Sequence, residues 1–99
     1  MSFVTIQPEV LASAAAELQV IGSAVDAGTA SAASPTTGVV PAAADPVSAL
    51  VATQFALHAQ AHQAISAQAA AIHQQFVSTM STSADSYALT EAANAATVD

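Results

Sequence analysis

The stretch Pro46–Ser83, PVSALVATQFALHAQAHQAISAQAAAIHQQFVSTMSTS, decides the fold, because after its first residue it holds neither glycine nor proline. Asp45 before it is a typical helix N-cap, and proline suits the first helical position, where its missing N–H costs nothing. Two series of positions at seven-residue spacing are mainly apolar, namely Val51, His58, Ile65 and Ile72, and Phe55, His62, Ala69 and Phe76. This spacing places them on one side of a helix. The sequence therefore predicts one long helix over about residues 46–83.

A second helix is predicted upstream of this stretch. Pro8 suits a first helical position, and Glu9 favours the positive end of the helix dipole. Pro35 predicts the helix end, because the residue before a proline is driven out of the helical conformation. The expected organisation is a single domain, residues 1–99, with helices at about 8–33 and 46–83, a loop at about 34–45 and a flexible tail at about 84–99.

The apolar residues exceed what two helices can bury against each other. An isolated helix pair of this size rarely reaches the several kcal/mol that a stable fold needs. The predicted fold class is therefore all-α, an antiparallel two-helix hairpin that forms half of a four-helix bundle with a partner. The residues expected to face partly the sister helix and partly that partner are Leu11, Leu18, Ile21, Val25, Val51, Phe55, Ile65, Ile72 and Phe76.

Composition excludes several classes of function. The 99 residues contain no lysine or arginine and carry a formal net charge of -7, so binding of nucleic acid or anionic membrane through basic contacts is excluded. Although 54% of the residues are hydrophobic, we expect no direct membrane anchoring, since no stretch approaches the roughly 20 strongly apolar residues of a bilayer span. The absence of cysteine excludes disulfides and thiol chemistry.

The candidate chemical groups predict neither a metal site nor an active site. His58 and His62 have the i, i+4 spacing of metal ligands, but the surrounding helix offers no Glu, Asp or Cys as a third ligand. We expect them at the edge of a packing surface, where they could make an interface sensitive to pH. No serine stands in a nucleophile elbow and no glycine-rich phosphate loop occurs. The expectation is no enzyme, no cofactor and no metal.

Several features together resemble a known family. Pro8-Glu9 lies near the start of an alanine-rich helix, the loop contains Val40-Pro41-Ala42-Ala43-Ala44-Asp45, and Tyr87-x-x-x-Glu91 follows the long second helix. Together they resemble the PE family of mycobacteria, which is named for its Pro-Glu pair. The resemblance covers essentially the whole chain. In contrast to many PE domains, this chain has no basic residue on its helices, so we expect an association of low salt sensitivity.

The resemblance implies a function that composition alone does not indicate. PE domains pair with a PPE protein into a four-helix heterodimer held mainly by apolar contacts, and a type VII secretion system exports the folded pair. The family's Y-x-x-x-D/E motif is the export signal, and Tyr87 and Glu91 occupy its two fixed positions. A cytosolic chaperone of the same system usually recognises the PPE partner. The expected location is cytoplasmic before export, then secreted or at the cell surface.

Two alternatives remain beside this interaction and secretion module. One is a self-associating structural protein, a homodimeric four-helix bundle without enzymatic activity. The other is a membrane-active amphipath, which the lack of cationic anchoring residues disfavours.

Overall fold

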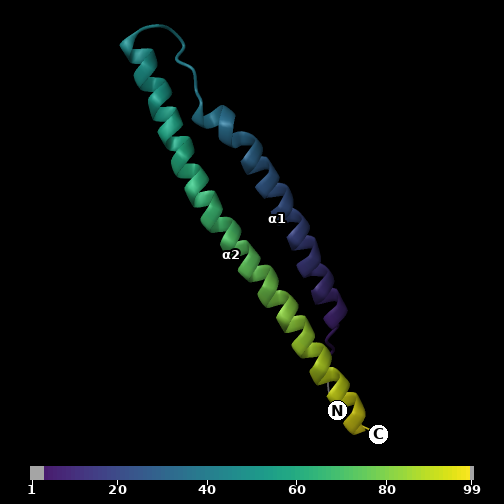
Figure 1. The fold of residues 1–99 in the computed structure, drawn as a ribbon. Helices are drawn as coiled ribbons and strands as arrows, with labels where there is room; N and C mark the ends of the chain where they lie inside the picture. Colours follow the sequence, from purple (N-terminus) through teal and green to yellow (C-terminus); the bar gives the residue numbers. More distant parts are fainter. Residues whose placement is uncertain (1–3, 99) are drawn as a thin grey trace. The chain divides into compact units, whose positions relative to one another are not determined.

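The computed structural model describes residues 4–98 and contains two helices, α1 (Pro8–Thr37) and α2 (Pro46–Val98), joined by residues 38–45 (Figure 1). No strand occurs among the described residues, and the predicted all-α class is confirmed. The bundle with a partner stays a prediction.

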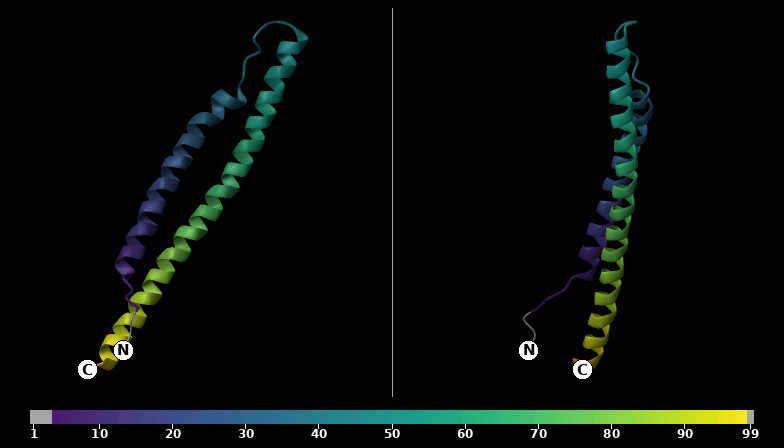
Figure 2. Two further views of the ribbon diagram at one scale, coloured as in Figure 1. Left: turned by 180° about the vertical axis from the view of Figure 1, so that it is seen from behind. Right: turned by 90° about the vertical axis from the view of Figure 1, so that its left-hand side faces the viewer.

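Where we predicted one domain, the structure divides into two compact units, each made from a segment of either helix. The terminal unit comprises Met1–Gly22 and His73–Asp99, and the loop unit comprises Ser23–Ile72. Within each unit the two helical segments lie side by side and run in opposite directions (Figures 1 and 2). The predicted antiparallel hairpin is confirmed.

The predicted start of α2 is confirmed by its cap. The backbone N–H of Ser48 donates to Asp45 Oδ1 at 2.8 Å, and the Ser48 hydroxyl donates to Asp45 Oδ2 at 2.8 Å. These bonds hold the pKa of Asp45 below its ordinary value of 3.8, the backbone bond contributing most. Pro46 follows as the first helical residue, in agreement with its fixed φ and missing N–H.

The predicted end of α1 near residue 33 is wrong, because the helix continues through Pro35 to Thr37. A proline this close to a helix end removes only the one bond that its own N–H would have made. The last turn is completed by other donors. The Thr37 hydroxyl donates to the Ala33 carbonyl at 2.7 Å, and the Gly38 N–H donates to the Ser34 carbonyl at 2.9 Å.

The predicted flexible tail from residue 84 is also wrong for the described residues, since α2 runs to Val98. We expected fraying because this segment has few large apolar residues. Its alanines and the absence of glycine and proline favour the helix instead. Thr90 and Ser86 point their hydroxyls back to carbonyls four residues earlier, at 2.9 and 3.0 Å. Asp99, also assigned to the tail, lies outside the described residues.

One helix of the described residues, α1, is long and apolar enough to cross a membrane by length and composition, with a mean hydropathy of 1.3 over its most apolar stretch. The expectation that no stretch passes such a test is therefore wrong. Asp26 inside α1 would cost about 2.5–3.5 kcal/mol at the centre of a bilayer. The expected lack of membrane anchoring stays a prediction.

Small residues predominate among the buried residues of the contact between the helices in both units. We call this contact the seam; its buried members are Ala15, Gly22, Ala52, Ala59, Val77 and Ala84. Side chains of this size let two helix backbones approach closely, but they remove little apolar surface from water. The large apolar residues of the chain therefore have to be accounted for elsewhere.

Candidate partner-binding face and export motif

Seven of the nine residues predicted to pack lie on the surface of this chain, each between 50% and 66% exposed. Leu11 and Leu18 are half-buried beside the seam. We call the exposed set the apolar face; its members are Ile21, Val25, Val51, Phe55, Ile65, Ile72 and Phe76. We predicted that some of the nine residues would face the sister helix and the others a partner. Only Leu11 and Leu18 lie near the sister helix.

In the terminal unit the apolar face lies on one side of the seam. Phe76 directly precedes the buried Val77 on α2, and Ile21 directly precedes the buried Gly22 on α1. One residue along a helix is a rotation of about 100°. In an antiparallel pair, one step back along either helix turns toward the same side. Ile21 and Phe76 therefore flank the seam on a common side of this unit.

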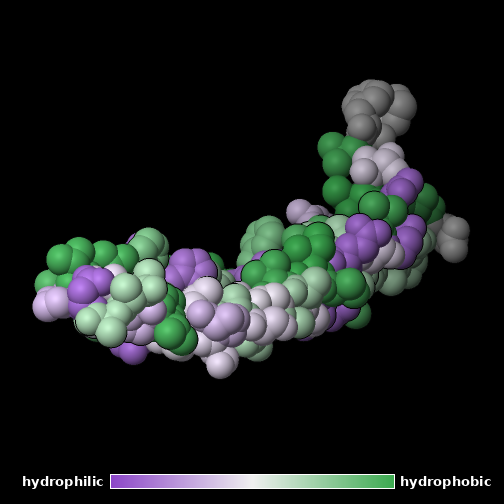
Figure 3. Space-filling view, turned by 90° about the horizontal axis from the view of Figure 1, so that it is seen from above, coloured by the Kyte–Doolittle hydropathy of each residue, from purple (hydrophilic) through white to green (hydrophobic). Residues whose placement is uncertain are grey.

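The loop unit repeats the arrangement. Val51 directly precedes the buried Ala52, and Ile65 and Ile72 follow Val51 at multiples of seven residues. The positions that follow the buried residues are polar instead, as at Thr53. The exposed surface thus mixes apolar side chains with polar ones, as Figure 3 shows for one view. The apolar face does not include every exposed large apolar residue, since Leu50 and Leu57 on α2 are 65% and 52% exposed as well.

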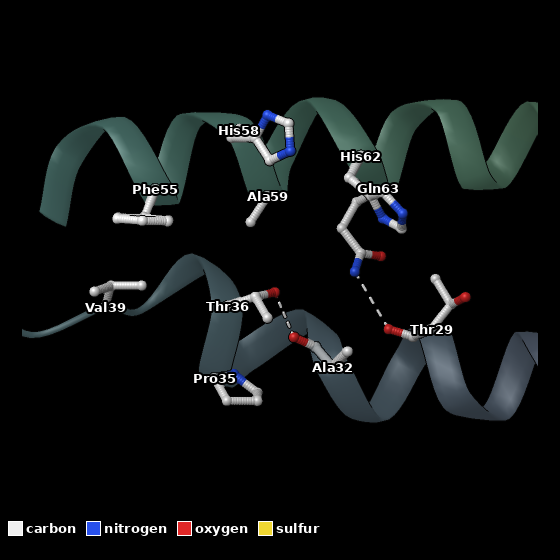
Figure 4. Close-up of a pocket in the computed structure, with 10 residues that line it drawn as sticks. All are labelled: Thr29, Ala32, Pro35, Thr36, Val39, Phe55, His58, Ala59, His62 and Gln63. Atoms are coloured by element: carbon white, nitrogen blue, oxygen red, sulfur yellow. Dashed lines mark hydrogen bonds between the residues drawn. The ribbon is translucent and has the colours of Figure 1, made fainter. Parts of the chain in front are cut away.

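A mainly apolar cavity of about 410 Å³ lies between the helices of the loop unit. Phe55, Ala59 and Gln63 point into it from α2 (Figure 4), and Gln63 Nε2 donates to the Thr29 carbonyl at 3.2 Å. Its full lining is Thr29, Ala32, Pro35, Thr36, Val39, Phe55, His58, Ala59, His62 and Gln63. Because Phe55 belongs to both the cavity and the apolar face, the cavity opens at the edge of that face.

His58 and His62 line this cavity and are both exposed. His62 Nδ1 lies 3.3 Å from the hydroxyl of Ser66. Among the described residues no group of three or more His, Cys, Asp or Glu side chains could hold a metal ion. That neither cofactor nor catalysis is involved stays a prediction, as does the pH-sensitive interface.

His73 has a structural role that sequence reasoning missed. Its Nε2–H donates to the Leu18 carbonyl of α1 at 2.6 Å, in a half-buried position of the terminal unit. The imidazole occupies the space above Gly22, where an added Cβ would lie 2.7 Å from His73 Cδ2. The available signal was Gly22 itself, a helix-weakening residue seven positions after Ala15.

The two short motifs predicted from the sequence lie in the same unit. Pro8 and Glu9 form the first turn of α1, and Tyr87 and Glu91 lie on the helical part of α2 that was predicted to be a tail. Tyr87 is 44% exposed and lines an open cleft of about 520 Å³ together with Thr5, Ile6, Gln7, Val10, Leu11 and Ala14. Tyr87 is therefore partly packed and held on a regular helix.

Comparison with known proteins gives consistent matches. The model of a family described as "PE family" matches residues 4–94. The chain is 62% identical over 96 residues to PE family protein PE13 of Mycobacterium tuberculosis, a match that covers 97% of each chain. It is also 54% identical over 99 residues to PE-PGRS family protein PE_PGRS33 of the same species, covering 100% of this chain and 20% of that protein. The chain thus spans about a fifth of that longer relative, and none of these names states an activity or a partner.

Proposed function

The chain belongs to the PE family, and from this premise we propose that it is an interaction and secretion module. It pairs with a PPE-family protein into a four-helix heterodimer. A type VII secretion system exports the folded pair, which is cytoplasmic before export and is then secreted or held at the cell surface. The cytosolic chaperone of that system engages the PPE partner.

The observation that carries the pairing is the apolar face. The chain buries mainly small seam residues and leaves all seven members of the apolar face at least half exposed. Full burial of such a side chain is worth about 1.5–3 kcal/mol, so covering the remaining exposed area is worth of the order of 1 kcal/mol each and several kcal/mol together. A partner that presents two apolar helix stripes would supply the missing half of a bundle core.

The charge distribution favours an apolar partner surface. Between Asp45 and Asp85 the chain has no charged residue apart from the titratable histidines, so most of the α2 part of the apolar face is free of fixed charge. Association would then depend little on salt.

A homodimer is the second candidate, because this same neutral face could meet a second copy without local repulsion. Two chains would, however, bring 14 carboxylates together (7 in each) without one lysine or arginine. This balance favours a different partner. Sedimentation of the isolated chain separates the candidates, since a stable helical dimer formed by the chain alone would support the homodimer.

The pairing is tested by placing a charge on the apolar face. Ile65→Asp or Phe76→Asp should abolish co-purification with the cognate PPE protein, because an unpaired carboxylate would have to be buried. Thr53→Asp is the matched control. Thr53 is exposed on the same helix but lies on the polar side of the seam, away from the apolar face, so this variant should still pair. Co-purification of both face variants at the wild-type level would refute the assignment.

The export signal is tested separately. In the proposal Tyr87 and Glu91 are recognised by the secretion machinery, so Tyr87→Ala should leave the pair intact and block export. Leu89→Ala is the control, since Leu89 is 74% exposed only two residues away on α2. Secretion of the Tyr87 variant at the wild-type level, measured as the fraction of the pair in the culture medium, would refute the signal.

A further inference from the structure

The cavity of the loop unit lies on the side of the seam that carries the apolar face. Phe55 belongs to both, and His62 follows it after seven residues on α2 and also lines the cavity. On α1, Ala32 lines the cavity seven residues after Val25, another member of the apolar face. A molecule that covers this part of the apolar face therefore also covers the mouth of the cavity.

The cavity extends inward from the apolar face to the seam. Its lining includes Ala59, which is buried in the seam, whereas Phe55 at its edge is 62% exposed. Figure 4 shows both side chains pointing into the space between the two helical segments. The volume of about 410 Å³ lies within the range of about 300–1,000 Å³ that is usual for ligand pockets. Only a long side chain or a small molecule would fill it.

None of the described residues that line the cavity carries a fixed charge. Asp26 and Asp45, the nearest carboxylates along the chain, are not part of the lining, and the chain has no lysine or arginine. A charged group that entered the cavity would lose hydration without gaining a fixed opposite charge. We therefore expect an uncharged occupant.

The lining also offers that occupant a hydrogen-bond acceptor. Gln63 Nε2 donates to the Thr29 carbonyl at 3.2 Å, and Gln63 Oε1 accepts no hydrogen bond from the described residues. A half-buried carbonyl oxygen is stabilised by an N–H or O–H donor. Phe55 at the edge adds an aromatic ring, against which a second ring packs favourably. An aromatic side chain with a donor, as in tryptophan or tyrosine, meets both conditions.

We propose that the cavity binds one anchor residue of the partner, a tryptophan or tyrosine on a helix that lies over the apolar face. The ring packs between Phe55 and Ala59, and its N–H or O–H donates to Gln63 Oε1. Buried aromatic anchors of this kind typically dominate the affinity of a protein interface. The inference rests on the proposed pairing through the apolar face and specifies the residue type that the partner inserts there.

A second copy of this chain is a poorer occupant. The chain contains no tryptophan, and its three phenylalanines have no donor for Gln63. Its single tyrosine, Tyr87, belongs to the terminal unit and already lines the cleft of that unit. The composition of the chain thus favours a different protein as the source of the anchor.

Filling the cavity distinguishes an occupied cavity from a face that a partner only covers. Ala32→Leu adds apolar atoms to the lining at an exposed position of α1. Added apolar area should keep or raise the affinity of a partner that only lies over the face. If a partner's ring occupies the cavity, the leucine competes with it, and we expect the affinity to fall about tenfold. Ala30→Leu is the matched control, because Ala30 is an exposed alanine of α1 outside the lining, about 200° around the helix from Ala32.

The affinity is measured by competition during co-expression. A variant and the wild-type chain compete for a limiting amount of tagged PPE partner, and mass spectrometry of the recovered pairs gives their ratio. The same competition is then repeated with alanine variants of the partner's tryptophans and tyrosines. One of them should favour Ala32→Leu over wild type, because the leucine fills the space that the missing ring leaves.

The outcomes separate this inference from the proposed pairing. Recovery of Ala32→Leu at or above the wild-type level overturns the anchor, whereas the pairing stands as long as Ile65→Asp and Phe76→Asp fail to pair. Normal pairing of both Asp variants refutes the pairing and the anchor together. If Ala32→Leu is recovered poorly with every partner variant, the occupant is not such a side chain and the inference fails. Rescue by one partner variant also excludes misfolding of Ala32→Leu as the cause of its loss.

Discussion

Replacing Gly22 by alanine sets two opposing effects against each other. In an exposed helix interior, Gly→Ala stabilises by about 1 kcal/mol, because glycine is the poorer helix former. At Gly22 the new Cβ would lie 2.7 Å from His73 Cδ2 and 2.8 Å from Nε2, so the imidazole has to move. That imidazole is held by its bond to the Leu18 carbonyl.

The steric effect outweighs the helix propensity. Overpacking typically costs about 1–3 kcal/mol. Loss of the His73–Leu18 hydrogen bond adds about 0.5–1.5 kcal/mol. After the gain in propensity, we expect Gly22→Ala to be destabilising by about 1–3 kcal/mol. At about 4–8 °C per kcal/mol for a domain of this size, that lowers the Tm by about 4–24 °C, and by less in a larger complex.

Gly28 provides the control on the same helix. An added Cβ there meets nothing within 4 Å, so Gly28→Ala should instead raise the Tm by about 4–8 °C. Thermal unfolding of the purified pair, followed by far-UV circular dichroism at one protein concentration, measures both. The double variant Gly22→Ala, His73→Ala removes the clash and should recover part of the loss. Equal stabilisation by Gly22→Ala and Gly28→Ala would show that the helices are not as close at Gly22 as the structure has them.

Two further predictions concern pH. Hydrogen bonds lower the pKa of Asp45 below 3.8, so its cap stabilises α2 fully above pH 3.8 and is lost as the pH falls through the lowered pKa. Asp45→Asn should therefore be less stable than wild type at neutral pH, and its helicity should change less as the pH is lowered into the acid range. An acid-induced change in helicity equal to that of wild type would contradict the cap. His58 and His62 line the cavity beside the apolar face, and α2 has no fixed charge near them, so we expect the affinity of pairing to differ between about pH 8 and about pH 5. The variant with glutamine at both positions should bind independently of pH, and a wild-type affinity that is constant over this range would rule the effect out.

The sequence predicted the helical hairpin because its period and its N-terminal signals are local properties. Pro8, Asp45 and Pro46 mark the two helix starts correctly. The predicted ends of α1 and α2 were wrong, because they were placed by single local signals, a proline and a scarcity of large apolar residues. Pro35 was expected to stop α1, but a proline this close to a helix end removes only one backbone bond. The sparse apolar residues after Ser83 were expected to stop α2, but alanine propensity favours the helix there.

It was harder to predict which apolar residues lie in the seam between the helices and which lie on the exposed apolar face. Large apolar residues at seven-residue spacing favour a helix contact, and the series from Val51 was expected to be shared with the sister helix. The structure places alanine, glycine and Val77 in that contact, because mainly small residues allow closer backbones, and it leaves Val51 and Phe76 outside. The role of His73 could not be predicted, since it depends on a neighbour on the other helix, at Leu18.

Members of the apolar face directly precede members of the seam along α2, as Phe76 precedes Val77, and this offset determines which mutations in α2 the protein tolerates. Inserting a single codon in the middle of the helix would leave both halves helical but rotate one by about 100° against the other. In the shifted half, Ile72 and Phe76 would take the positions that His73 and Val77 hold now. Random mutagenesis should therefore recover many viable substitutions at polar sites such as Thr53, whereas viable single-codon insertions in α2 should be rare.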